Sequence, residues 1–238
     1  IQALIHAFQQ LALRLKYFSK PVVAALRGQA LGGGCELMMH CSRTVASFEA
    51  YPGLVEVGVG LIPAGGGCKE LALRVAQHAT QNDISNRMKA VFEQTAMGQV
   101  ATCAQDAIRK LFLRQEDRIL MHKNEVLYGA LTEIKALSEQ NFRPPLPNKV
   151  LVAGREGRAM FKVGLVNWLK GGFISEHDDY IADKLAYVLC GGDVNEGEQV
   201  TETWLLKLER EAFIDLVKTP KTQQRIEHFL KTGKPLRN

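Results

Sequence analysis

A run of three glycines, Gly32-Gly33-Gly34, constrains the fold of this chain more than any other feature of its sequence. It follows the short apolar run Val22–Leu26, which has no polar alternation and therefore predicts a strand covered on both faces. It precedes residues 35–41, which are apolar enough for a buried helix. Glycines at such a junction either let the helix pack closely against the strand or expose N–H groups that stabilise an anion. Both uses predict an α/β unit.

The alternation of helix and strand extends through the first 75 residues. Residues 44–48 predict a second strand, and a second glycine run at 64–67 opens another helix. Beyond residue 76, apolar residues recur at helical spacing. We predict an α/β core over residues 1–76 and a helical region over residues 77–238. Helices are expected at 1–18, 83–95, 103–113, 116–140, 154–170, 176–190, 198–218 and 220–231.

Composition is that of a soluble globular protein, with 46% hydrophobic and 23% charged residues. No apolar run approaches the ~18 residues of a membrane span. Because the chain begins at Ile1 inside a predicted helix, we expect further residues upstream of it. The five cysteines form no CxxC pair, which indicates free thiols in the cytoplasm and no zinc or other metal site.

The net charge of +5 is concentrated near the C-terminal end of the chain. The basic cluster there is either a solvated helix face or a surface that attracts a phosphorylated ligand. A nucleic-acid partner is not expected, because no known reading motif accompanies the charge. The cluster comprises Lys218, Lys221, Arg225, Lys231, Lys234 and Arg237.

Two glutamates stand in apolar surroundings close to the glycine runs. Glu36 lies in the first turn of the helix that starts at Gly32–Gly34, and Glu56 is flanked by valines. An isolated glutamate at a helix start is commonly a surface residue favoured by the helix dipole. A carboxylate enclosed by aliphatic side chains beside an anion-stabilising turn is also how a general acid or base is built. We therefore predict that the two glutamates form an acid/base pair.

Two segments resemble the signature motifs of the enoyl-CoA hydratase/isomerase (crotonase) family. Residues 20–37, KPVVAALRGQALGGGCEL, are similar to its first motif, and residues 53–67, GLVEVGVGLIPAGGG, are similar to its second. The dense resemblance covers residues 20–74, about a quarter of the chain. It implies a crotonase-like fold of stacked ββα units, incomplete at the N-terminus and followed by a mostly helical C-terminal region.

The resemblance implies roles for individual residues. The family's two catalytic glutamates match Glu36, which we assign to activating water as the base, and Glu56, which we assign to protonating C2. The middle glycine of the first motif, whose N–H donates to the thioester oxygen, matches Gly33. The expected substrate-binding residues include Leu61 and Pro63, which would shape the acyl pocket. The others are Gly32, Gly34, Gly65, Gly66 and Lys234, with packing or solvation as the alternative for the last three.

Residues 211–213 and 222–238 resemble the C-terminal helices of the crotonase fold. This ending and the long helical insert after residue 76 are most similar to the C-terminal hydratase-like part of bacterial two-part β-oxidation proteins, whose N-terminal part is a 3-hydroxyacyl-CoA dehydrogenase. This resemblance implies hydration of trans-2-enoyl-CoA, an acyl-CoA substrate, and contact with a dehydrogenase part or oligomerisation. No cofactor is implied here, since NAD would serve only the dehydrogenase. Two departures stand out. The family's other oxyanion donor would precede Ile1, and Gln223 and Gln224 stand near the place of an acidic residue in the tail.

Two other functions fit the same residues. Double-bond isomerisation of enoyl-CoA in this superfamily can use the second glutamate alone, whereas retention of Glu36 favours a hydratase. A non-catalytic scaffold or oligomerisation domain is the alternative outside the enzymes, because the long helical region supplies surface for such a role. Substitution of both glutamates distinguishes catalysis from scaffolding.

Overall fold

The apolar run before the glycines forms the first strand of a three-stranded parallel sheet. The computed structural model describes residues 1–238, and its sheet has the order β1-β2-β3. β1 (Val23–Leu31) pairs with β2 (Arg43–Gly53), which pairs with β3 (Arg118–Leu120). Parallel neighbours need a crossover, and α2 (Gly33–Met39) supplies it between β1 and β2. The strand is longer than the apolar run Val22–Leu26 predicts, because β1 continues past Arg27 and Gly28 to Leu31. The pairing with β2 shifts register between Leu26 and Gly28 and then continues to Leu31.

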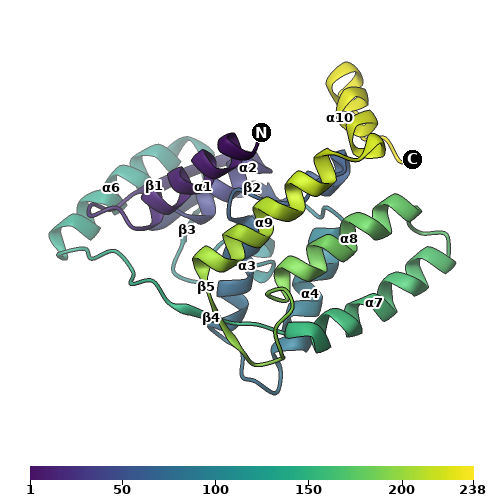
Figure 1. Cartoon of the computed structure of the whole chain (residues 1–238). Coiled ribbons are helices and arrows are strands. Elements are labelled where there is room, and N and C mark those ends of the chain that lie inside the picture. Colours follow the sequence, from purple (N-terminus) through teal and green to yellow (C-terminus); the bar gives the residue numbers. More distant parts are fainter.

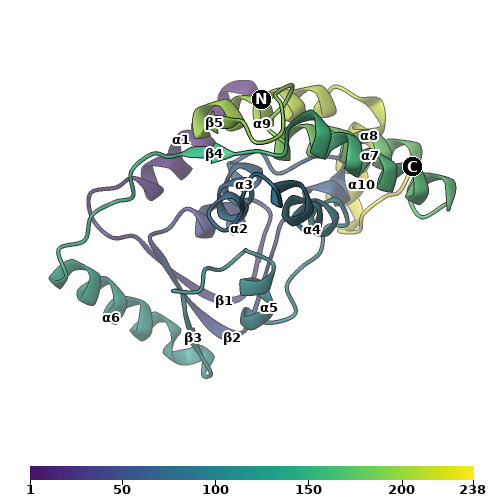
Figure 2. The ribbon, with the colours of Figure 1, turned by 90° about the horizontal axis from the view of Figure 1, so that it is seen from below.

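Helices cover both faces of this sheet (Figure 2). α2 lies against β1 on one face, and α6 (Val126–Glu139) packs on β1 and β2 from the other. Val45 of the sheet is buried against Val126 and Ala130 of α6. β2 is buried over most of its length, whereas Leu26 is the one buried residue of β1, so the prediction that this apolar run is covered on both faces was wrong for most of β1.

A larger helical assembly lies beside the sheet (Figure 1). A single core of 40 buried residues runs from Leu26 to Leu216, so the α/β part and the helical part share one interior. No helix is long and apolar enough to cross a membrane. The helices of this assembly are α1 (Gln2–Lys16), α3 (Gly67–Ala76), α4 (Ile84–Ala96), α7 (Gly154–Lys170), α8 (Glu176–Leu189), α9 (Glu202–Val217) and α10 (Pro220–Thr232). The short helix α5 (Ala104–Arg109) packs on β2 instead.

Three predicted helices differ from the structure. The segment 116–140 begins as β3 and the 3₁₀ helix η2 (Lys123–Glu125), because its start is tied to β2: the Asp117 carboxylate accepts from Thr44 N at 2.8 Å. The predicted helix 103–113 ends early, at Arg109, and Leu111 just beyond it has a left-handed φ of 61° that cannot continue the helix.

The predicted helix 198–218 starts later than expected, since its first residues form β5 (Gln199–Thr201), antiparallel to β4 (Lys149–Leu151). The other predicted helices lie close to their expected positions. Because β3 lies beyond residue 76, the sheet draws on both parts of the chain.

Candidate active site

The first glycine run positions Glu36 at the start of α2. Gly32 precedes the helix with φ 54° and ψ −127°, a bend that favours glycine, and its carbonyl accepts from Glu36 N at 3.0 Å. As the first residue of α2, Gly33 has no partner for its N–H within the helix. The Glu36 side chain is buried, at 4% exposure. The local sequence therefore places a carboxylate and a free N–H group on the same helix turn.

The second glycine run holds the carboxylate of Glu36. Its Oε1 accepts hydrogen bonds from Gly65 N and Gly67 N, both at 2.8 Å. A β-carbon on Gly65 would lie 2.5 Å from Oε2 of Glu36, and one on Gly67 would lie 2.8 Å from Oε1. Glycines at these two positions therefore let the backbone at the start of α3 approach the carboxylate closely.

Glu56 lies beside the first glycine run on the 3₁₀ helix η1 (Glu56–Val59). A β-carbon on Gly32 would lie 3.4 Å from its Oε1. Both carboxylate oxygens of Glu56 are buried, and neither has a hydrogen-bond partner. Burial raises the pKa of Glu56 well above its ordinary value, and the neighbouring charge of Glu36 raises it further. Both effects favour the protonated form of Glu56 over the carboxylate.

Glu36 differs from Glu56 because hydrogen bonds oppose the effect of burial. Burial raises the pKa of Glu36 to about 7, and the N–H donors of Gly67 and Gly65 limit that rise. Two neighbouring carboxyl groups therefore have different proton affinities, which suits one to accept a proton and the other to donate it.

A third carboxyl group, Glu209 of α9, joins this pair and was not predicted. It is fully buried and accepts from Gly66 N at 2.9 Å and from Lys69 N at 2.7 Å. Burial and the charge of Glu36 raise its pKa to about 8. A signal for it exists in the sequence, because Glu209 occupies the apolar stripe of α9 with Leu205, Ala212 and Leu216.

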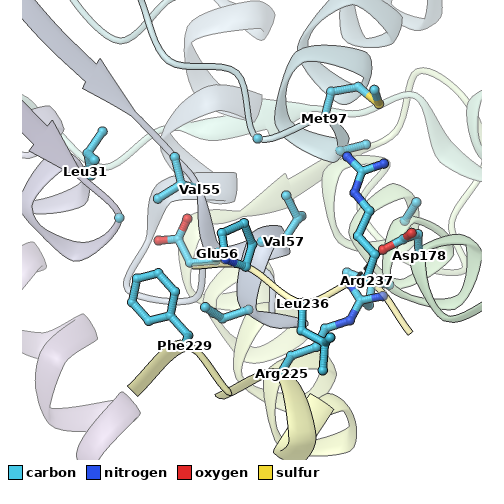
Figure 3. Close-up of a pocket in the computed structure, with 18 of the residues that line it drawn as sticks. Leu31, Val55, Glu56, Val57, Met97, Asp178, Arg225, Phe229, Leu236 and Arg237 are labelled. Atoms are coloured by element: carbon cyan, nitrogen blue, oxygen red, sulfur yellow. Dashed lines mark hydrogen bonds and ion pairs between the residues drawn. The ribbon is translucent and has the colours of Figure 1, made fainter. Parts of the chain in front are cut away.

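A cavity of about 570 Å³ opens beside Glu56 and the first glycine turn (Figure 3). Glu56 lies at one side of it, and Arg225, Arg237 and Asp178 lie at the other. Its walls come from distant parts of the chain and are largely apolar. They include Leu31, Gly32, Gly33, Val55, Val57, Met97, Ile181, Phe229, Pro235 and Leu236.

The structure brings only some of the predicted site residues to this cavity. Gly32, Gly33 and Glu56 line it. Glu36 lies behind the glycine turns, where the Phe8 ring packs against Gly33 and Gly65. The predicted residues that do not line the cavity are Gly34, Leu61, Pro63, Gly65, Gly66 and Lys234.

These remaining residues are either buried away from the cavity, exposed to solvent or hydrogen-bonded to glutamates. Leu61 and Pro63 are buried in the interior, whereas Lys234 and Gly34 are exposed. Gly65 and Gly66 use their N–H groups on glutamates rather than on the cavity. No group of three or more His, Cys, Asp or Glu side chains is arranged to hold a metal ion.

Arg225 fixes the wall of the cavity, and we expect its removal to destabilise the protein. It is 1% exposed, and it donates to Asp178 Oδ1 at 2.7 Å and to Asn238 Oδ1 at 2.8 Å. Arg225→Met should lower the free energy of unfolding in urea by roughly 2 kcal/mol, since it leaves a partly buried carboxylate without its partner. Arg87→Met, in an exposed ion pair with Asp83, should change it by less than about 0.5 kcal/mol. Equal effects of the two substitutions would contradict this account of Arg225.

Comparison with known proteins agrees with this geometry. Residues 2–115 match the family model described as enoyl-CoA hydratase/isomerase. A stretch of 59 residues, 25% of this chain, is 49% identical to 23% of the short-chain-enoyl-CoA hydratase of Clostridium acetobutylicum. Among solved structures, carnitinyl-CoA hydratase from Mycobacterium avium superposes with a TM-score of 0.54 at 20% identity, covering 94% of this chain and 65% of that one.

The first part of the chain, residues 2–115, matches the enoyl-CoA hydratase/isomerase (crotonase) family, and the predicted α/β crotonase-like fold is confirmed. Over all 238 residues the chain is also 43% identical to the "Probable 3-hydroxyacyl-CoA dehydrogenase" of Bacillus subtilis (strain 168). The chain spans 30% of the length of that relative.

Proposed function

We propose that this chain provides the hydratase site of a larger 3-hydroxyacyl-CoA dehydrogenase protein, adding water to trans-2-enoyl-CoA in fatty-acid β-oxidation. The observation that supports this most strongly is the Glu56 carboxyl group, buried without a partner at the wall of the cavity and next to Glu36. A protein retains such a group where chemistry needs it, because an unpaired buried carboxyl is costly. The whole-length likeness to the Bacillus subtilis dehydrogenase supports the larger protein.

The proposed reaction uses each group once. The N–H of Gly33 donates to the thioester oxygen and stabilises the charge that develops there, an effect typically worth about 10²–10³ in rate. Glu36 accepts a proton from water while the water oxygen bonds to C3. Glu56 gives its proton to C2, so the substrate gains one water molecule, and the proton taken up by Glu36 must return to Glu56 before the next turnover. These steps need no metal or redox cofactor. NAD would serve only the dehydrogenase part of the larger protein. This chain would contact that dehydrogenase part.

Isomerisation of the enoyl-CoA double bond is the second candidate. It draws on the observation that Glu56 lines the cavity while Glu36 lies behind the glycine turns. A single carboxyl group suffices to move a proton between C2 and C4, because the same group can accept and return it. The two candidates therefore differ in whether Glu36 is needed.

Glu36→Gln separates the two candidates. In the protein as its gene encodes it, we expect the unsubstituted form to hydrate crotonyl-CoA and Glu36→Gln to hydrate it roughly 10²–10⁴-fold more slowly. Absorbance at the enoyl-thioester band measures hydration, and 3-hexenoyl-CoA as substrate measures isomerisation. Glu49→Gln, at an exposed position of β2, is the matched control. Isomerisation without hydration, unaffected by Glu36→Gln, would replace the hydratase proposal with the isomerase. Absence of both activities would leave the scaffold.

A further inference from the structure

The turn that holds Glu36 is shared with a second buried carboxylate. Along residues 65–69, the N–H groups of Gly65 and Gly67 donate to Glu36, and those of Gly66 and Lys69 donate to Glu209. The four distances lie between 2.7 and 2.9 Å. Alternate N–H groups of one turn therefore go to carboxylates from α2 and α9. A rotation of the turn that loosens one set of bonds would loosen the other.

Other groups reinforce the same turn from α9 and α1. Glu202, at the start of α9, accepts from the Lys69 ammonium at 3.1 Å. Together with Glu209, it lets α9 bind Lys69 at both its side chain and its backbone. Gln9 donates to the Ala64 carbonyl at 2.8 Å. These contacts fix the turn. Among the groups that bind it, Glu209 is the one whose carboxylate accepts from the same run of N–H groups, residues 65–69, as Glu36 does.

We infer that Glu209 is a positioning residue for Glu36: by binding the turn at Gly66 and Lys69, it fixes the N–H groups that orient the Glu36 carboxylate. This inference rests on the proposed function only where it concerns catalysis. A role limited to docking α9 on α3 is the alternative, and it predicts effects confined to Gly66 and Lys69.

The charges around Glu209 make its removal informative. Lys69 faces it from α3, while Glu36 and His40 face the turn from α2. Glu56 on η1 and Cys68 on α3 also sense the charge of Glu209. Glu209→Gln removes the ionisable group but keeps one acceptor oxygen, whereas Glu209→Ala removes both acceptors. The two variants together separate loss of the ionisable group from loss of the turn contacts.

Backbone amide exchange tests the inference without any reference to activity. In ¹⁵N-labelled protein we expect Glu209→Ala to speed exchange of the Gly65 and Gly67 amides by about tenfold or more, as local opening becomes easier. Glu209→Gln should give a smaller change of the same pattern, and it provides the test if the alanine variant does not fold. Glu211→Gln, at an exposed position of α9, should leave these two amides unchanged. Faster exchange at Gly66 and Lys69 alone would overturn the inference.

Kinetics tests the consequence for the reaction. Because a small misplacement of a reacting group can cost about 100-fold in rate, Glu209→Gln should lower kcat for crotonyl-CoA hydration by about 10- to 100-fold. KM should stay within about threefold, since Glu209 does not line the cavity. An unchanged kcat in Glu209→Gln, with Glu36→Gln inactive, overturns the positioning role. If Glu36→Gln keeps full activity, the proposed function fails instead, and the exchange experiment still decides the link between Glu209 and the turn.

Discussion

Glu56→Gln should slow hydration of crotonyl-CoA by roughly 10²–10⁴-fold and, at neutral pH, raise the melting temperature of the protein. The loss of rate follows from removal of the carboxyl proton that Glu56 offers to C2. The gain in stability follows from the buried, unpartnered state of the Glu56 carboxyl group. An uncharged amide has no ionised form in the unfolded chain, so folding no longer has to reprotonate this position. Opposite signs for activity and stability distinguish a catalytic role from simple damage to the fold.

The stability difference should depend on pH in a defined direction. Glu56 has a higher pKa in the folded protein than in the unfolded chain, where a glutamate titrates near ~4.3. Between these two pKa values the folded state binds more protons, so the unsubstituted protein loses stability as pH rises. Below about pH 4 Glu56 is protonated in both the folded and the unfolded state, so it no longer lowers the stability of the unsubstituted protein. The higher melting temperature of Glu56→Gln should therefore disappear at that pH.

Melting temperatures at pH 5 and pH 8 measure this dependence. The gap between Glu56→Gln and the unsubstituted protein should widen from pH 5 to pH 8. Glu49→Gln, at an exposed site on β2, should show no such gap at either pH. A melting temperature that falls in Glu56→Gln at pH 8 would show that the carboxylate is stabilising, and the acid role would lose its physical basis.

Much of the fold could be predicted because its determinants are local in sequence. Helical apolar spacing located α1, α4, α7, α8 and α10, and the continuous apolar run located the start of β1. The failures came from contacts between distant segments. β3 forms because Asp117 and its neighbours bind β2, 73 residues away, which overrides a helix-forming sequence. Local periodicity has no information about such pairing.

The residues of the candidate site also differ in whether their sequence neighbours or only distant contacts reveal them. Glu36 and Glu56 could be singled out because apolar neighbours enclose each of them in the sequence itself. Glu209 could not be linked to them, since the bond from Lys69 N to Glu209 spans 140 residues. The walls of the cavity from α8 and α10 were equally hidden. The second glycine run was expected near substrate, but only three-dimensional packing reveals that its N–H groups face glutamates.

Gly65→Ala should impair both folding and activity, because the second glycine turn has no room for a methyl group. A β-carbon there would lie 2.5 Å from Oε2 of Glu36 and would overlap the Phe8 ring still more closely. The carboxylate cannot retreat without losing its bonds from Gly65 N and Gly67 N. Overpacking of this kind costs about 1–3 kcal/mol in the free energy of unfolding. Displacement of Glu36 should also lower kcat by about 100-fold.

Gly164→Ala is the matched control for Gly65→Ala. A β-carbon at Gly164, within α7, meets no atom within 4 Å, so alanine there should stabilise the helix by about 0.5–1 kcal/mol and leave activity unchanged. A second substitution identifies the clashing partner. Phe8→Leu shortens the ring side chain, and the double variant Phe8→Leu/Gly65→Ala should regain part of the stability lost in Gly65→Ala, a coupling that a double-mutant cycle measures. If Gly65→Ala behaves like Gly164→Ala in urea unfolding and in kcat, the tight seat of Glu36 against this turn is wrong, and with it the reason for glycine at this position.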